Sequence, residues 1–187
     1  MHLNFASIVA ALAVFGSSPA IGAGCLNVNQ ATLNLIKEFE GFVASPEPDP
    51  IGLPTVGFGH LCKQKNCAEI SFKFPLTQAN AVSLLQADIH AFTRCLDLYI
   101  NNKVKLNENQ WGALASWTFN VGCGNVKSSS LVKRLNAGEN PNSVASQELP
   151  QWNKGGGKVL PGLTRRRNAE VKLFQTPTSH EAHPNCA

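Results

Sequence analysis

The chain has 187 residues, which is enough for one domain with a sizeable hydrophobic core. Its 16 Lys and Arg residues exceed its 12 Asp and Glu residues, so the formal net charge is +4. This small excess of positive charge suits an anionic polymer such as a bacterial cell wall. Nucleic acid is a weaker candidate, because the single basic cluster, Arg165-Arg166-Arg167, has no interleaved aromatic residues. After residue 23 no stretch is long and apolar enough to span a bilayer, so we expect no membrane partner.

Residues 1–23 are expected to form a secretory signal peptide. They contain an apolar run from Phe5 to Phe15, which small residues follow, including Gly22 and Ala23 at the expected cleavage site. A buried N-terminal helix is the alternative, but the run is short and has neither a cap nor a polar face. We therefore predict one domain over residues 24–187.

The cysteines all lie after that segment, and their even number suits an oxidising compartment. A zinc site is the alternative, but the sequence has no Cys-x-x-Cys, and His180, Glu181 and His183 lack a second ligand pair at finger spacing. We predict no metal site. The predicted disulfides pair Cys62 with Cys67, Cys95 with Cys123, and Cys25 with Cys186.

A small β lobe is expected after a first helix. The helix is predicted over Gln30 to Glu40, with Asn29 as its N-cap and Gly41 as its stop. From residue 42 to residue 74 the density of proline and glycine excludes long helices. Short extended pieces are predicted in this lobe at Thr55 to His60 and at Ile70 to Phe74.

Residues 75–175 are predicted to form a larger helical lobe. Thr77 is the expected N-cap of a helix that could join the two lobes. Its buried face comprises Ala81, Leu84, Leu85, Ile89, Phe92 and Leu96. Later helices are expected at 107–122, 131–135, 144–149 and 163–174, with a loop over 153–158 and a polar, extended tail over 176–187. This order of elements predicts an α+β fold.

Two acids in the first part of the chain suit the hydrolysis of a glycosidic bond. Glu40 ends the first helix, where the negative end of the helix dipole suits a carboxyl that holds a proton, as a general acid does. Asp49 lies in a proline-flanked loop that water can reach, so it can stay ionised and activate a water molecule, which the Thr55 hydroxyl could help to hold. Ordinary roles are the alternatives: a solvated acid, an Asx turn and a strand residue. None of them accounts for the three spacings together.

The spacing Glu40-Gly41 followed by Asp49-x-x-Gly52-x-x-Thr55-x-Gly57-x-Gly59-His60 resembles the catalytic signature of the phage-type lysozymes, glycoside hydrolase family 24. The resemblance continues in Leu76-Thr77-x-x-x-Ala81-x-x-Leu84-Leu85-x-x-Asp88, in Gln110-x-x-Ala113-Leu114-x-Ser116-x-x-Phe119-Asn120-x-Gly122, and in Pro161-Gly162-Leu163-x-x-Arg166-Arg167-x-x-Glu170. With the signal peptide and the cysteines, the chain is similar to the secreted fungal branch. Glu47 is a departure from many relatives and adds an acid near the expected cleft.

The resemblance implies a lysozyme-like fold, with an N-terminal helix, a small β lobe and a larger helical lobe that enclose a cleft. It also implies roles for a catalytic triad: Glu40 as the general acid, Asp49 as the carboxylate that activates water, and Thr55 as the third member. The saccharide cleft would be lined by Leu61, Phe119, Asn120 and Ser130.

Three supporting residues follow from the same resemblance. His60 and Asp88 match a pair that joins the lobes, and we expect this contact to lower the pKa of Asp88. Arg166 matches an arginine that holds the general acid in place, and Arg165 and Arg167 are the alternatives because the cluster leaves the register open.

The implied activity is that of a secreted, monomeric muramidase that needs no cofactor. It would hydrolyse the β-1,4 bond between N-acetylmuramic acid and N-acetylglucosamine in bacterial peptidoglycan, with inversion at the anomeric carbon. A chitin or chitosan hydrolase is one alternative, since it would share a paired-acid cleft. A non-catalytic protein that binds the cell wall is another, although a binder need not keep Glu40, Asp49 and Thr55 together.

Overall fold

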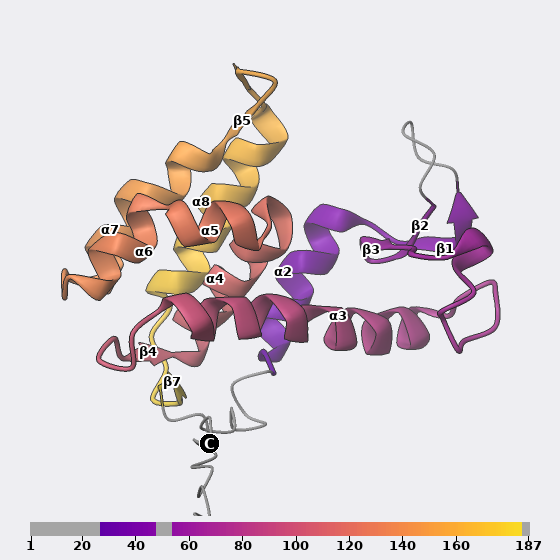
Figure 1. Ribbon diagram of the computed structural model, residues 1–187, viewed down its shortest axis with the longest axis horizontal. Helices are drawn as coiled ribbons and strands as arrows, with labels where there is room; N and C mark the ends of the chain where they lie inside the picture. Colours follow the sequence, from indigo (N-terminus) through magenta and orange to yellow (C-terminus); the bar gives the residue numbers. More distant parts are fainter. Residues whose placement is uncertain (1–26, 48–53, 185–187) are drawn as a thin grey trace, which may run out of the picture.

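The computed structural model describes residues 27–47 and 54–184, which form a small sheet lobe and a larger helical lobe (Figure 1). The predicted signal peptide, together with Cys25 and Cys186, lies outside the described residues. Within the described ranges, none of the helices combines the length and the apolar composition that a bilayer span requires.

Helix α2 spans Gln30–Glu40, as predicted. The Asn29 side chain accepts a hydrogen bond from the backbone N–H of Thr32 at 3.0 Å, which satisfies a donor that the first turn leaves free. Gly41 has φ +73° and ends the helix, because few other residues adopt that backbone conformation without strain. The helix therefore ends at Glu40, where the chain enters the sheet (Figure 1).

The sheet lobe contains one antiparallel sheet with the strand order β1-β2-β3. Its strands are β1 (Val43–Glu47), β2 (Thr55–Gly57) and β3 (His60–Leu61), and a short 3-10 helix, η1 (Lys65–Cys67), follows. The strand predicted at Ile70–Phe74 is wrong, since those residues are irregular. Their apolar side chains pack on the core without a neighbouring strand, and Pro75 cannot donate a ladder hydrogen bond.

Helix α3 (Gln78–Tyr99) runs along both lobes and joins them (Figure 1). The Thr77 hydroxyl accepts a hydrogen bond from the backbone N–H of Asn80 at 3.1 Å, so the predicted N-cap is confirmed. The predicted inward face is also confirmed: Ala81, Leu85, Ile89 and Leu96 are buried, and Leu84 and Phe92 are half-buried against the core.

The helical lobe is built around α4 (Glu108–Val121), which packs against α2, α3 and α8. Asn107 and Gln110 form a capping box at its start. Residues 111–118 are all buried, as expected of a helix that neighbours surround on every side. The other helices of the lobe are α5 (Cys123–Ser128), α6 (Ser130–Asn136), α7 (Pro141–Glu148), η2 (Leu149–Trp152) and α8 (Pro161–Gln175).

Two small pairs of strands add regular structure outside the β lobe. Strands β5 (Lys154–Gly155) and β6 (Lys158–Val159) form a hairpin within the predicted loop. Strand β7 (Glu181–His183) lies in the segment predicted as a polar, extended tail, and it pairs with β4 (Leu106–Asn107), which comes directly before α4. His183 is fully buried, and its ring stacks on Trp111 with the centroids 5.1 Å apart. Tertiary packing thus orders a segment whose polar composition indicated a tail.

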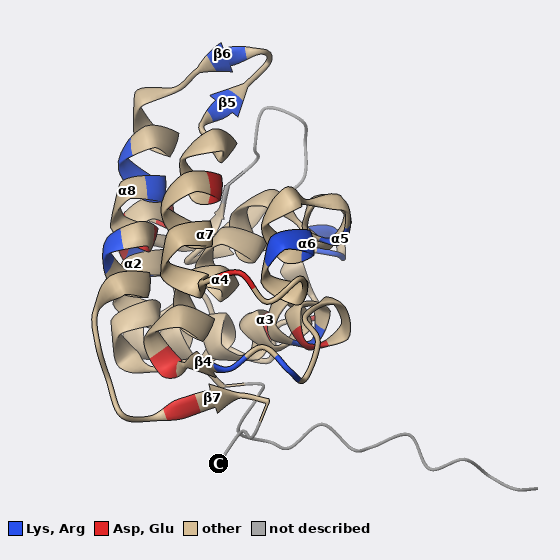
Figure 2. Ribbon diagram, turned by 90° about the vertical axis from the view of Figure 1, so that its left-hand side faces the viewer, with Lys and Arg blue, Asp and Glu red and all other residues tan. Residues whose placement is uncertain are grey.

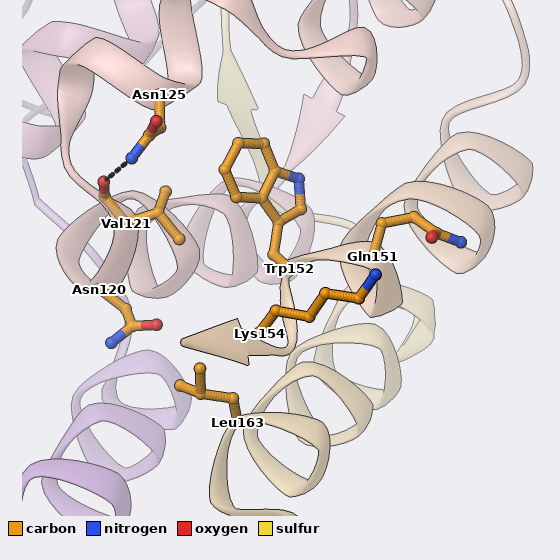
Figure 3. Close-up of a pocket in the computed structure, with 7 residues that line it drawn as sticks. All are labelled: Asn120, Val121, Asn125, Gln151, Trp152, Lys154 and Leu163. Atoms are coloured by element: carbon orange, nitrogen blue, oxygen red, sulfur yellow. Dashed lines mark hydrogen bonds between the residues drawn. The ribbon is translucent and has the colours of Figure 1, made fainter. Parts of the chain in front are cut away.

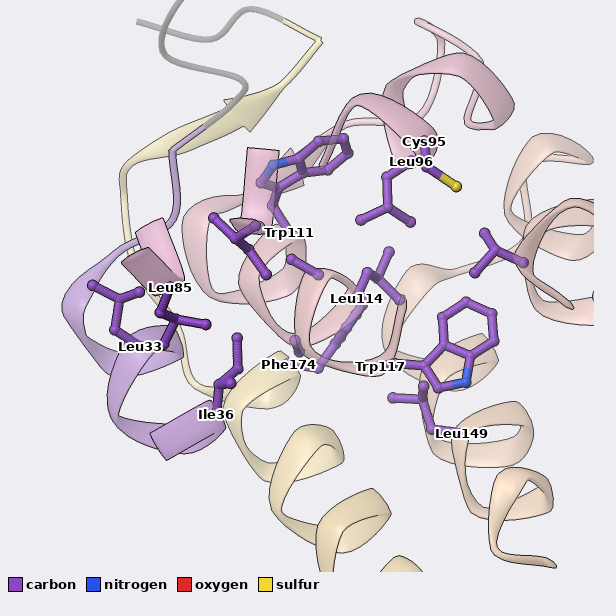
Figure 4. Close-up of a cluster of buried hydrophobic side chains, with 14 of the residues drawn as sticks. Leu33, Ile36, Leu85, Cys95, Leu96, Trp111, Leu114, Trp117, Leu149 and Phe174 are labelled. Atoms are coloured by element: carbon purple, nitrogen blue, oxygen red, sulfur yellow. The ribbon is translucent and has the colours of Figure 1, made fainter. Parts of the chain in front are cut away.

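One hydrophobic cluster fixes the helices that carry the site residues (Figure 4). Helix α4 contributes Trp111, Leu114 and Trp117 to this cluster, and α2 and α8 pack around it through Ile36 and Phe174. Because α2 and α8 share this core, the end of α2 keeps a fixed position relative to α8.

Two of the predicted disulfides lie within the described residues, and both are formed. Cys62 pairs with Cys67 inside the sheet lobe, with the Cα atoms 4.9 Å apart. Cys95 of α3 pairs with Cys123 of α5, with the Cα atoms 5.9 Å apart. The proposed pair of Cys25 with Cys186 stays a prediction.

The disulfide that closes the longer segment of chain is expected to stabilise the fold more. Replacing Cys95 and Cys123 with alanine should lower the free energy of unfolding by about 3 to 4 kcal/mol, and replacing Cys62 and Cys67 by about 2 kcal/mol, because the sequence separations are 28 and 5 residues. Urea unfolding of both double variants against the oxidised protein measures the difference. Equal losses would contradict the loop-entropy account.

Candidate functional site

Glu40 is held by Arg166, where the end of α2 meets α8. Its Oε1 lies 2.6 Å from Nη1 of Arg166. The Arg166 side chain is buried, whereas 22% of the Glu40 side chain remains exposed. Arg165 instead lies over the Phe39 ring, and Arg167 contacts Glu170. The structure therefore selects Arg166 from the basic cluster as the partner of Glu40, and the carboxyl is fixed yet accessible.

Gly59 brings the backbone of the sheet lobe against the same carboxyl. It has φ +85°, and a Cβ atom there would lie 3.0 Å from Oε2 of Glu40 and 3.2 Å from the Phe119 ring. Any side chain at this position would displace Glu40 or Phe119, and this steric limit explains why the motif has glycine at position 59.

A buried ionic cluster lies behind Glu40. Glu170 is fully buried: its Oε1 accepts hydrogen bonds from the Ser116 hydroxyl at 2.8 Å and from Nε of Arg166 at 3.2 Å, and its Oε2 lies 3.1 Å from Nε of Arg167. Burial raises the pKa of Glu170, and the two guanidinium groups oppose that rise. The spacing of the arginines three and four residues before Glu170 could have indicated contact within the helix, but it gave no sign of burial.

His60 lies between two carboxyl groups and joins the lobes. Its Nδ1 is 2.7 Å from Oδ2 of Asp88 on α3, and its Nε2 is 3.4 Å from Oε1 of Glu69. The expectation that the pKa of Asp88 is lowered is wrong: burial raises this pKa by more than the contact with His60 lowers it. The sequence indicated the partner of Asp88 but not how much of the carboxyl is removed from water.

Glu69 should stabilise the sheet lobe only while it is ionised. Its Oε1 accepts the backbone N–H of Lys63 at 2.5 Å and its Oε2 that of Gln64 at 3.1 Å. The Lys63 bond contributes most to lowering the pKa of Glu69. This stabilisation is therefore complete above the ordinary pKa of a glutamate, about 4.3, and is lost as the pH falls through the lower folded value.

Glu69→Gln should accordingly reduce the midpoint of urea unfolding at pH 7. The difference from the wild type should vanish as the pH is lowered towards about 2, where nearly all carboxyl groups are protonated. Glu38→Gln, at an exposed position of α2, is the control and should change the midpoint little. A loss that is the same at every pH would contradict the role of the Glu69 charge.

A cleft of about 530 Å³ lies between the sheet lobe and the helices α3 and α4. Of the predicted cleft residues, Leu61, Phe119 and Asn120 line it, as does His60. Ser130 is not among its lining residues in the described part of the chain: it begins α6, and its hydroxyl donates to a carboxylate oxygen of Glu148.

Two smaller hollows adjoin this cleft, and Asn120 lines all three. A hollow of about 400 Å³ lies between α4, η2 and the start of α8 and includes Trp152 and Lys154 (Figure 3). A hollow of about 320 Å³ includes Glu40 and Arg166. The exposed Asn120 amide thus stands where the cleft meets both hollows.

Of the other two members of the proposed triad, the structure describes Thr55 but not Asp49. Thr55 begins β2, where it is half-buried and pairs with Leu61 of β3. On its other side, the backbone of Glu47 pairs with Thr55. Asp49 lies outside the described residues, and so its place relative to Glu40 stays a prediction.

His60, Cys62 and Glu69 place potential metal-binding atoms within 4.8 Å of one another. However, the Cys62 sulfur is bonded to Cys67, and both carboxylate oxygens of Glu69 accept backbone hydrogen bonds. This donor set does not suit zinc, which binds cysteine as a free thiolate.

A small sheet and a larger helical lobe, with an acid at a helix end beside the cleft, define a lysozyme-like α+β protein. Residues 37–170 match the family described as phage lysozyme. The chain belongs to this family.

Relatives and solved structures agree with this membership. The chain is 37% identical over 158 residues to the endolysin of Bacillus phage PZA, covering 82% of this chain and 57% of that protein. It is 35% identical to the endolysin of Acyrthosiphon pisum secondary endosymbiont phage 1, covering 81% and 99%. It thus spans little more than half the length of the Bacillus phage relatives, 57% and 56%.

Two solved structures have the same fold. The muramidase domain of SpmX from Asticaccaulis excentricus superposes with a TM-score of 0.68 and 29% identity, covering 80% of this chain and 98% of that domain. A mutant of P22 lysozyme gives a TM-score of 0.68 and 25% identity, covering 80% and 99%.

Proposed function

We propose that this protein is a secreted muramidase that hydrolyses the β-1,4 bond between N-acetylmuramic acid and N-acetylglucosamine in bacterial peptidoglycan. The observation that carries the proposal is the Glu40 carboxyl, which a buried arginine fixes beside the cleft while leaving it accessible. Membership of the phage lysozyme family supports the reaction type. The protein acts as a monomer and needs no cofactor.

In the proposed mechanism Glu40 donates its proton to the glycosidic oxygen as the bond to the anomeric carbon breaks. Asp49 accepts a proton from a water molecule, whose oxygen attacks that carbon from the opposite face, and Thr55 orients the water. The product has the inverted, α configuration. This geometry requires the carboxyl groups of Glu40 and Asp49 to lie roughly 6.5 to 9.5 Å apart.

The distribution of charge favours an anionic polymer as the substrate. Figure 2 shows Lys and Arg on β5, β6 and α8, and the hairpin contributes Lys154 and Lys158. Positive charge near a cleft raises the local concentration of an anionic polymer. Neither nucleic acid nor a membrane is proposed as a partner.

Export to an oxidising compartment is part of the proposal. The disulfides of Cys62 with Cys67 and of Cys95 with Cys123 are typical of exported proteins. The signal peptide at residues 1–23 would direct this export.

Turbidity of a bacterial cell-wall suspension tests the proposal, with chitin and chitosan in parallel. Clearing of the cell walls alone supports muramidase activity, whereas hydrolysis of chitin or chitosan would favour that substrate instead. Binding to the walls without clearing would indicate a non-catalytic wall-binding protein. NMR of the first product, before mutarotation, tests inversion: a β-anomer that appears first would contradict it.

A further inference from the structure

The side-chain amide of Asn120 is held from inside the protein by Arg167. Nη2 of Arg167 donates a hydrogen bond to Oδ1 of Asn120 at 2.8 Å. A guanidinium group has no acceptor atom, so it can meet only the oxygen of the amide. The nitrogen and oxygen of Asn120 point to opposite sides (Figure 3), and within the described part of the chain Nδ2 has no acceptor. Two N–H donors are therefore available to a molecule in the cleft.

Arg167 is buried at a cost that stability alone does not explain. The side chain is fully buried, and its Nη1 has no hydrogen-bond partner among the described residues. Burial lowers the pKa of Arg167 to about 10, so the group is still protonated at neutral pH. A buried charge with an unpaired N–H is less favourable than an apolar side chain of similar size. This cost points to a functional reason for the arginine.

Glu170 links this contact to the one at Glu40. Its carboxylate lies against both arginines, of which Arg166 contacts Glu40 and Arg167 contacts Asn120. One buried carboxylate thus supports two guanidinium groups: one fixes Asn120, which lines the cleft, and the other fixes Glu40, which lines the adjoining hollow.

We infer that Arg167 is a positioning residue, which orients the Asn120 amide so that Nδ2 donates a hydrogen bond to an acceptor oxygen of the bound saccharide near Glu40. This inference rests on the proposed function. Because Nδ2 can only donate, its partner on the saccharide must be an acceptor such as an N-acetyl carbonyl oxygen or a hydroxyl oxygen.

Asn120→Asp tests the donor directly, because aspartate has the shape of asparagine and still accepts from Arg167 but donates nothing. KM for soluble peptidoglycan fragments should rise about tenfold with kcat little changed, since one hydrogen bond is lost in both the bound and the transition state. The midpoint of unfolding should not fall. Gln151→Glu adds the same charge to the hollow in Figure 3 and controls for repulsion of the substrate. Equal KM values for both variants would overturn the inference.

Arg167→Gln tests the positioning. It should raise KM about as much as Asn120→Ala, about tenfold, and the double variant should be no worse than Asn120→Ala alone. Arg167→Lys keeps a charged donor on a long side chain, whereas the glutamine amide is uncharged and shorter, so the lysine variant should restore part of the loss. Additive effects on KM would instead show that Arg167 acts on substrate binding independently of Asn120, and would overturn the positioning role.

An NMR measurement without substrate separates this inference from the proposed function. The side-chain NH₂ signals of Asn120, identified by their loss in Asn120→Asp, should be dispersed and rigid in the wild type and should shift in Arg167→Lys. Signals that are mobile, and that are the same in both proteins, would overturn the positioning role whatever the activity. If the wild type clears no cell walls, the proposed function is refuted, but the NMR signals still test whether Arg167 orients Asn120. If Arg167→Gln does not fold, Arg167→Lys and Asn120→Asp still decide the case.

Discussion

Glu40→Gln is expected to lower kcat on bacterial cell walls by about 10²- to 10⁴-fold, the usual contribution of a general acid. Glutamine keeps the length and shape of the side chain, and its oxygen can still accept the hydrogen bond from Nη1 of Arg166. It has no proton to donate to the glycosidic oxygen. Because the change removes proton transfer rather than substrate contact, KM should change far less than kcat.

The fold of this variant should survive, because Arg166 keeps Glu170 as a partner when the charge at position 40 is lost. Circular dichroism and the midpoint of urea unfolding check this point. Glu38→Gln, two positions earlier on α2 and exposed, is the matched control and should clear cell walls at the wild-type rate. A Glu40→Gln protein that clears walls nearly as fast as the wild type would rule out Glu40 as the general acid.

Local signals were enough to predict the elements that carry Glu40 and Asp88. Asn29 and Gly41 bound α2 through backbone effects that act within one turn, and Thr77 does the same at the start of α3. Tertiary effects account for what the sequence did not show. The tail was expected to be extended, but its pairing with β4 depends on the burial of His183 against Trp111, which a polar sequence does not indicate.

The supporting residues show the same limit. Successive residues on a helix point about 100° apart, so the choice among Arg165, Arg166 and Arg167 depends on where α2 lies, which the sequence does not state. The raised pKa of Asp88 reflects burial, again a property of the assembled lobes. Pairs of charges three or four residues apart are usually exposed. Nothing in the sequence therefore distinguished the buried Glu170 from a surface acid.

Glu170→Gln is expected to lower the free energy of unfolding by about 3 to 5 kcal/mol, because it removes the charge that compensates a buried arginine. Arg166 would keep Glu40 as a partner at 2.6 Å, but Arg167 is fully buried and would lose the carboxylate that it contacts at 3.1 Å. Urea unfolding at neutral pH measures the loss. Glu139→Gln is the matched control: it removes an exposed partner of Arg134, and exposed pairs contribute little.

A double-mutant cycle separates the unpaired charge from a general packing defect. In an Arg167→Gln background the charge that Glu170 compensates is already gone, so Glu170→Gln should there cost far less than it does alone. A cost that is the same in both backgrounds would mean that the carboxylate acts through shape or through its hydrogen bond with Ser116. A loss no larger than that of Glu139→Gln would show that water reaches Arg167. In that case Arg167 would stay charged beside Asn120 even without the Glu170 carboxylate.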